Sequence, residues 1–320
     1  MKQFLILYAL IIVFTNKMFA QQNSFSEKTI SVPFNSCTIE GTLLIPDKNS
    51  KQLKLAIIVA GSGPTDRNGN SILGVSANSY KILAEELAKQ GIASFRYDKR
   101  GIGKSVPKNF TESNLVFEDY INDITAIFDC LKDSLGYKNI YLIGHSEGSL
   151  TGMVASQRRP MKGYISLSGA GRSIDVVIEE QIKSQPAFVR DKVDSIFLSL
   201  KAGKKVDSVP AFLYSLFRPS VQPYMISWLK YNPVAEIGKL KCPVLIIQGI
   251  CDMQVKMEDA NNLHEANKKS RLDIILSMTH TLKNAGENCV DDGQKTYHDA
   301  TLPLNKQLVI DVVHFIIENN

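Results

Sequence analysis

Cysteine is scarce in this sequence, and the few cysteines present are not spaced as metal ligands. Five occur among 320 residues, and no two of them form the Cys-x-x-Cys pair that is typical of structural zinc sites. A chain of this length buries enough apolar surface to fold without disulfide bonds. The sequence therefore predicts neither a metal site nor a core that depends on disulfides. The five are Cys37, Cys130, Cys242, Cys251 and Cys289.

An apolar run long enough to span a bilayer comfortably is also lacking. The run from Phe4 to Phe14 has about eleven residues, whereas a membrane-spanning helix needs roughly 20. Lys2 precedes this run and Ala20 follows it, which is the pattern of a secretory signal peptide. We therefore expect residues 1–20 to be removed and the mature protein to be periplasmic or extracellular, without a stable membrane anchor. An uncleaved N-terminal anchor is the alternative.

Excess charge of one sign is absent. The formal net charge is +5, and it falls to +3 when Lys2 and Lys17 leave with the signal peptide. This positive charge is too weak and too scattered to predict a nucleic-acid partner. The hydrophobic content of 44% and charged content of 22% are those of an ordinary globular protein. The length fits a single α/β domain with an insertion.

Strand-like and helix-like segments alternate from residue 29 onward. Continuous apolar runs such as 55–60 are typical of strands buried on both faces of a parallel sheet. The alternation predicts an α/β fold with a mainly parallel, doubly wound sheet. Segments 29–34 and 37–45 alternate polar and apolar residues, which predicts an N-terminal antiparallel hairpin. Further strands are expected at 92–97, 139–143, 163–167, 243–248 and 272–276, and helices at 80–88, 120–131, 149–157, 257–268 and 304–318.

About seventy residues, 171–240, interrupt this alternation. They contain two helical patterns and end in an aromatic stretch that includes Trp228. We predict that they form a helical cap over the carboxyl edge of the sheet. The core would then consist of residues 21–170 and 241–320.

The segment Gly144-His145-Ser146-Glu147-Gly148 lies between a strand-like run and a helix-like segment. The pattern Gly-x-Ser-x-Gly in this context is typical of a nucleophile elbow. The turn is so tight that the serine adopts a positive φ, which lifts its hydroxyl clear of the sheet. Side chains two residues to either side would collide, so glycine is needed at both positions. Ser146 is the predicted nucleophile.

A serine hydroxyl needs a base to accept its proton, and the sequence offers five histidines. Only His280 directly follows the carboxyl end of a predicted strand, where the elbow serine also emerges. His145 lies in the elbow and is expected to point away from the site, because neighbours at a tight turn diverge. The other three, His264, His298 and His314, lie in helical patterns or a polar connection.

The base in turn needs a carboxylate that holds its tautomer. Asp252 directly follows another predicted strand and lies between Ser146 and His280 in the chain, an order known for serine triads. Asp175 is the alternative acid, and Asp252 could instead only cap the helix that follows it. No assignment here calls for a cofactor.

The oxyanion of a tetrahedral intermediate needs preorganised N–H donors. The backbone N–H of Glu147, directly after the nucleophile, is one candidate. The other is expected in the glycine-rich loop that begins at Gly61, at Ser62 or alternatively at Gly63. Phosphate binding by this loop is disfavoured because the Lys-Ser/Thr ending of a P-loop is missing.

Four segments stand out: GSGPTDRNG (61–69), YDKRGIGKS (97–105), GHSEG (144–148) and MTHTLK (278–283). Together they resemble the α/β-hydrolase superfamily, and more narrowly bacterial serine esterases related to the dienelactone hydrolase and prolyl-oligopeptidase-like groups. The resemblance extends over residues 29–319 and implies a Ser-His-Asp esterase without metal or cofactor. Dienelactone hydrolases use a cysteine where this chain has Ser146, and the propeller domain of prolyl peptidases is not encoded. Cys251 beside the acid is a further departure.

We therefore expect an exported serine hydrolase that cleaves carboxylic esters of small molecules through an acyl-enzyme. A peptidase or amidase with the same triad is the nearest alternative, because the site alone does not define the leaving group. A non-catalytic binding protein is the alternative from another class. The aromatic end of the cap would narrow the pocket and favour acetyl to butyryl groups, although side chains such as Trp228 are more typical of cap packing.

Two of the cysteines, Cys251 and Cys289, fall near predicted triad loops. In an oxidising compartment they are candidates for a disulfide.

Overall fold

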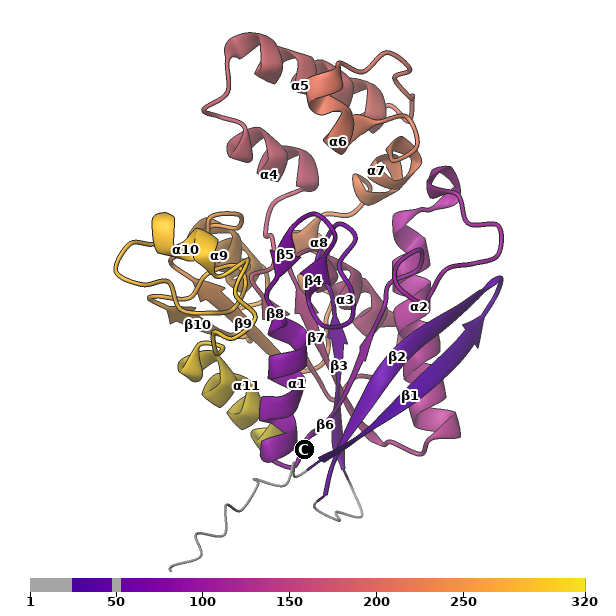
Figure 1. The fold of residues 1–320 in the computed structure, drawn as a ribbon, viewed down its shortest axis with the longest axis vertical. Helices are drawn as coiled ribbons and strands as arrows, with labels where there is room; N and C mark the ends of the chain where they lie inside the picture. The colour runs from indigo at the N-terminus through magenta and orange to yellow at the C-terminus, as the bar shows by residue number, and fades with distance from the viewer. Residues whose placement is uncertain (1–24, 48–52, 320) are drawn as a thin grey trace, which may run out of the picture.

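The computed structural model describes residues 25–47 and 53–319. The predicted signal peptide, residues 1–20, lies outside this part of the chain. An eight-stranded sheet organises the fold, with strand order β1-β2-β6-β3-β7-β8-β9-β10 (Figure 1). Its strands are β1 (Phe25–Phe34), β2 (Cys37–Pro46), β3 (Lys54–Val59), β6 (Ala93–Tyr97), β7 (Asn139–His145), β8 (Gly163–Leu167), β9 (Val244–Gly249) and β10 (Arg271–Ile275).

The strand directions confirm the predicted α/β-hydrolase arrangement. The hairpin strand β1 pairs antiparallel with β2, and β2 pairs antiparallel with β6. All the other pairs in this sheet, from β6 to β10, are parallel. The carboxyl ends of the parallel strands therefore meet at one edge, which is where a doubly wound sheet binds its ligands.

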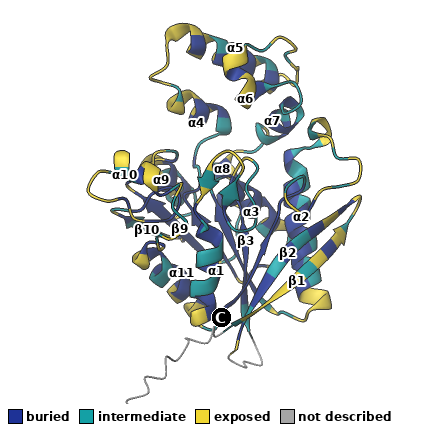
Figure 2. Ribbon diagram, viewed as in Figure 1, coloured by how far each residue is buried: buried dark blue, intermediate teal, exposed yellow. Residues whose placement is uncertain are grey.

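Helices cover both faces of the sheet and bury its central strands, as Figure 2 shows by their dark colour. One apolar cluster joins one face to helices α2 (Phe117–Asp129), α3 (Glu147–Arg158) and α9 (Met257–Ala266). A second cluster joins the other face to α1 (Ser79–Lys89) and α11 (Lys306–Glu318). Burial on both faces explains why β3 and β7 read as continuous apolar runs rather than alternating ones.

The insertion after β8 forms helices that stand above the carboxyl edge of the sheet in Figure 1. Its own apolar cluster is centred on Phe197 and Phe217. Two of these helices also contact the core: α7 packs against α2, and α8 packs against α3 and α9. All of them lie in the segment predicted as a cap, 171–240. Its helices are α4 (Ile174–Gln181), α5 (Ala187–Lys201), α6 (Tyr214–Phe217) and α7 (Gln222–Trp228), and α8 spans Pro233–Ile237.

Several short elements were not predicted. The glycine-rich loop carries a two-stranded ribbon of β4 (Asn70–Ser71) and β5 (Val75–Ser76). Elements of two to five residues are too short to show an apolar period, so the sequence pattern does not reveal them. The others are η1 (Glu112–Asn114), η2 (Cys130–Ser134), η3 (Ala211–Leu213) and α10 (Asp291–Lys295). Within the described part of the chain, no helix has the length and apolar character that a membrane crossing requires.

Candidate active site

Ser146 is the single residue between strand β7 and helix α3, and its backbone has φ 54° and ψ −121°. A Cβ added at Gly144 would collide with the backbone of Gly148. A Cβ added at Gly148 would collide with the carbonyls of Val59 and Ala60 at the end of β3. The two glycines therefore let the turn close against the neighbouring strand. This is the geometry predicted for a nucleophile elbow.

Asp252 and His280 come together from the ends of two neighbouring strands. The Nδ1 atom of His280 donates to Oδ2 of Asp252 over 2.8 Å, and both side chains are buried. The other carboxylate oxygen accepts the N–H groups of Gln254 and Val255 at 2.8 and 2.9 Å. Burial pushes the pKa of Asp252 up, but the charge of His280 and these hydrogen bonds outweigh it and lower the pKa to about 2.

The hydrogen bond at Nδ1 leaves the Nε2 atom of His280 available to accept a proton. Ser146 and His280 line the same small cavity of about 110 Å³, together with Ser62. The arrangement at this edge of the sheet therefore suits a nucleophile, a base and an acid that orients the base.

The alternative acid, Asp175, lies elsewhere. Its carboxylate forms an ion pair with Lys201, which joins helices α4 and α5 of the cap. Lys201 and hydrogen bonding outweigh the effect of burial and lower the pKa of Asp175. Asp175 thus stabilises the cap, and Asp252 is the carboxylate beside His280.

The candidate oxyanion donors lie on either side of Ser146. Glu147 begins α3, so its N–H belongs to the first helical turn, where backbone N–H groups have no partner within the helix. The glycine-rich loop passes so close that a Cβ added at Gly61 would lie 3.1 Å from Cβ of Ser146. Ser62, the next residue, lines the cavities on both sides of the nucleophile.

A second cavity, of about 340 Å³, lies between the elbow and the cap. Its lining is mostly apolar and includes Trp228 and Tyr224 of α7. The ring of Trp228 also stacks on the buried Phe117, with centroids 5.4 Å apart. Trp228 is therefore both a packing residue and a wall of the cavity, so the two predicted roles coincide.

His145 does not point away from the site, and that prediction is wrong. Its buried ring lies 4.7 Å from the ring of His280, measured between centroids. Nε2 donates to the backbone carbonyl of His280 over 2.8 Å, and Nδ1 accepts from the hydroxyl of Tyr80 over 2.7 Å. Burial and the nearby charge of His280 lower the pKa of His145 to about 3. His145 is thus a neutral hydrogen-bonding residue behind the candidate base.

Sequence reasoning also missed Tyr80 and Lys99. Tyr80 follows the apolar period of α1, so the sequence pattern indicates only a packed face of that helix. Lys99 is the second residue after β6, and a charged residue near the carboxyl end of a parallel strand was a signal that could have found it. Both side chains are buried beside the elbow.

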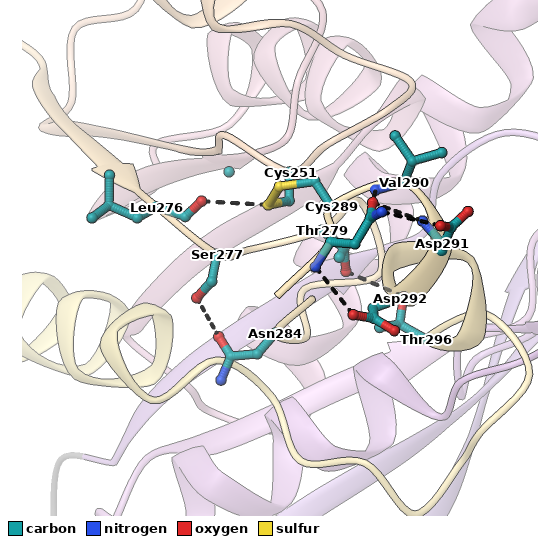
Figure 3. Close-up of a disulfide and its surroundings, with 12 residues drawn as sticks. Cys251, Leu276, Ser277, Thr279, Asn284, Cys289, Val290, Asp291, Asp292 and Thr296 are labelled. Atoms are coloured by element: carbon teal, nitrogen blue, oxygen red, sulfur yellow. Dashed lines mark hydrogen bonds between the residues drawn. A yellow bond between two sulfur atoms is a disulfide. The ribbon is translucent and has the colours of Figure 1, made fainter. Parts of the chain in front are cut away.

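A disulfide joins Cys251 to Cys289, with Cα atoms 4.9 Å apart (Figure 3). This is the pairing predicted from their positions. It ties the residue that precedes Asp252 to the segment that follows His280. Among residues 25–47 and 53–319, no group of three or more His, Cys, Asp or Glu side chains could hold a metal ion.

Comparison with solved structures identifies the fold. Est1E from Butyrivibrio proteoclasticus, solved with bound ferulic acid, superposes with a TM-score of 0.62 at 22% identity and covers 91% of this chain and 98% of its own. The esterase Pf2001 of Pyrococcus furiosus superposes with a TM-score of 0.56 at 19% identity, covering 92% of this chain and 93% of its own. The chain has the α/β-hydrolase fold.

Sequence comparison points to the same group of enzymes. Residues 73–211 of this chain match the family model for serine aminopeptidase, S33. Esterase EstD of Thermotoga maritima is 27% identical over 244 residues, which are 75% of this chain and 55% of EstD. The human serine hydrolase BPHL is 24% identical over 66% of this chain and 71% of BPHL. This chain thus spans about half the length of EstD.

Asp252→Asn should lower kcat by about 10³–10⁴-fold, because Asn does not hold the tautomer of His280 that accepts a proton at Nε2. The matched variant Asp175→Asn should retain nearly full kcat. Steady-state ester hydrolysis by both variants checks this. If Asp175→Asn lost activity and Asp252→Asn kept it, the acid would be misassigned.

The buried His145 predicts a loss of stability in acid. Its pKa is about 3 in the folded chain, against a reference value of about 6.5 in the unfolded chain. Between these values the unfolded state binds the extra proton, so the free energy of unfolding falls by up to about 1.4 kcal/mol per pH unit as the pH decreases. From pH 7 to pH 4.5, the wild type should lose about 2–3 kcal/mol more than His145→Asn. Urea unfolding at both pH values measures the difference, and equal losses would contradict the prediction.

Proposed function

We propose that the hydrolase cleaves carboxylic esters of small molecules through an acyl-enzyme on Ser146. The observation that carries this proposal is the Asp252–His280 hydrogen bond, at 2.8 Å, beside a serine with positive φ. A serine hydroxyl at such a turn, with a buried imidazole oriented by a carboxylate, is the arrangement that acyl transfer requires.

In the proposed reaction, the Oγ atom of Ser146 attacks the ester carbonyl while Nε2 of His280 accepts its proton. The N–H groups of Glu147 and Ser62 stabilise the resulting oxyanion. The C–O bond to the alcohol then breaks, and His280 returns the proton to the leaving oxygen. A water molecule, deprotonated by His280, attacks the acyl-enzyme in the same way and releases the acid. Throughout, Asp252 stabilises the imidazolium.

The two cavities suggest where the halves of the ester bind. The alcohol must leave within reach of His280, which lines the small cavity, so we assign the acyl group to the cavity beneath the cap. A volume of about 340 Å³ falls within the roughly 300–1,000 Å³ of typical ligand sites. It therefore favours acyl groups larger than the acetyl to butyryl range predicted from the sequence. The ferulic acid bound by Est1E is a ligand of this larger kind.

A serine aminopeptidase is the second candidate, because the matching family model carries that description. Such an enzyme needs a carboxylate to bind the α-amino group of its substrate. Among the described residues that line the cavity beneath the cap, Glu147 is the only carboxylate. Its Oε1 atom lies 3.4 Å from Nζ of Lys99, so its charge is already neutralised. This pairing favours the ester over the peptide.

Ser146→Ala should abolish acyl-enzyme formation and leave the fold intact, because it removes one oxygen at the surface of a cavity. Stoichiometric labelling by a fluorophosphonate should occur in the wild type and disappear in the variant, with an unchanged melting temperature. Chromogenic acetyl, butyryl, octanoyl and cinnamoyl esters, with aminoacyl anilides as the comparison, then define the substrate. An unlabelled wild type would indicate a non-catalytic binding protein, and preferential turnover of anilides would indicate the aminopeptidase.

We also propose that the hydrolase is exported. The signal-like pattern of residues 1–20 is one reason, and the Cys251–Cys289 disulfide supports it because disulfides persist in oxidising compartments. Expression of the full chain in a bacterium should yield protein that begins at Gln21 outside the cytoplasm, as measured by intact mass after fractionation. Full-length protein that stays in the cytoplasm would contradict export.

A further inference from the structure

Gly61 directly precedes the candidate oxyanion donor Ser62, and two buried side chains hold both of its backbone polar groups. The N–H of Gly61 donates to the hydroxyl oxygen of Tyr80 over 3.0 Å. The carbonyl of Gly61 accepts from Nζ of Lys99 over 2.6 Å. Tyr80 is 4% exposed and Lys99 is 3% exposed, so neither hydrogen bond competes with bulk water.

The same two side chains each contact a residue adjacent to the nucleophile. The hydroxyl of Tyr80 donates to Nδ1 of His145, the residue before Ser146, over 2.7 Å. Nζ of Lys99 lies 3.4 Å from the carboxylate of Glu147, the residue after Ser146. His145 and Glu147, the two variable positions of the Gly-x-Ser-x-Gly turn, are thus connected to Gly61. Tyr80 makes the connection from His145, and Lys99 makes it from Glu147.

We propose that Tyr80 and Lys99 form a clamp that sets the position of the Ser62 N–H relative to Ser146 and so preorganises the oxyanion hole. Both are positioning residues, since they act through Gly61. The inference rests on the proposed function, because an oxyanion hole has a role only in acyl transfer.

The local backbone explains why such a clamp is needed. Ser62 lies between two glycines, and Gly63 has φ +74° with no atom near the position of an added Cβ. Within the loop, Thr65 restrains the carbonyls of Ser62 and Gly63, so the N–H side of Ser62 depends on how Gly61 is held. Oxyanion donors stabilise a transition state only if they are held in place before the reaction. A displacement of about 1 Å is enough to cost up to about 100-fold in rate.

The Tyr80 side of the clamp extends to the candidate base. The Nε2–H group of His145 donates to the backbone carbonyl of His280, so His145 links Tyr80 to the candidate base. Burial raises the pKa of Tyr80, so its hydroxyl remains a donor to His145. The Lys99 side ends at Glu147, and the ammonium also lies 4.9 Å from the ring centroid of Tyr120.

The test compares Tyr80→Phe and Lys99→Met with two matched controls. Tyr141→Phe removes a hydroxyl that bonds the carbonyl of Asn319, and Lys54→Met removes an ammonium that bonds the carbonyls of Ile316 and Ile317. Both controls therefore break bonds to the C-terminal end of helix α11. Lys99→Met leaves the carboxylate of Glu147 unpaired. The double variant Lys99→Met/Glu147→Gln keeps the backbone N–H at 147 and removes that charge, in case the single variant does not fold.

Active sites are first counted by end-point titration with a fluorophosphonate. We expect kcat per titrated site to fall about 10–100-fold in the clamp variants, with KM changed less than about 3-fold. A trifluoromethyl ketone, whose tetrahedral adduct places an oxyanion in the hole, should lose affinity by a similar factor. The control variants should keep wild-type values per site.

An unchanged kcat per titrated site would overturn the clamp. A loss confined to the fraction of titratable sites would reflect stability, and a change confined to KM would reflect substrate binding. Either of these outcomes would also overturn it. Failure of the proposed function is distinguishable from this: the wild type itself would then neither titrate nor hydrolyse esters, and both proposals would fall together.

Discussion

The close contact between the Ser146 turn and strand β3 is the constraint on which the rest of the structure depends. Gly148 packs on the carbonyls of Val59 and Ala60, so the turn closes only if β3 lies parallel beside β7. That pairing also brings the glycine-rich loop, which leaves β3, against the nucleophile. The parallel order of β3, β7, β8, β9 and β10 then delivers Asp252 and His280 to the same edge. One steric requirement at a turn thus determines which loops meet.

Burial strengthens the ion pairs and hydrogen bonds between the polar groups at this edge of the sheet. Asp252, His280, Lys99 and Glu147 are each less than a tenth exposed, and each charged group faces a partner. In a low-dielectric environment an unpaired charge is costly and a paired one is strongly held, so the side chains are kept in place without bulky packing around the nucleophile. His145 meets the same requirement by remaining neutral and using both ring nitrogens in hydrogen bonds.

The cap and the disulfide both contribute to this edge of the sheet. The cap helices close the larger cavity over the elbow, and Trp228 ties the cap to Phe117 of α2 while it lines that cavity. The Cys251–Cys289 bond restrains the loops that carry the candidate acid and base. Access to the nucleophile is therefore shaped by an insertion, whereas the base is held by the core and by a covalent link.

The amino-acid sequence by itself determined the fold class, the hairpin, the elbow and the residues at strand ends, because these depend on local patterns: apolar periods, glycines at a tight turn, and polar residues where a strand stops. The placement of Ser146, Asp252 and His280 after strands at one edge of the sheet was predictable for that reason. Only the tertiary structure decided what Tyr80, Lys99 and His145 do, because their partners are 19 to 135 positions away and their periodicity or neighbours suggested other roles. The size of the cavity was likewise undetermined by the sequence, since its walls come from the loops, the elbow and the cap together. Contacts between distant segments depend on how side chains pack, and the spacing of residues along the chain does not reveal which segments pack together.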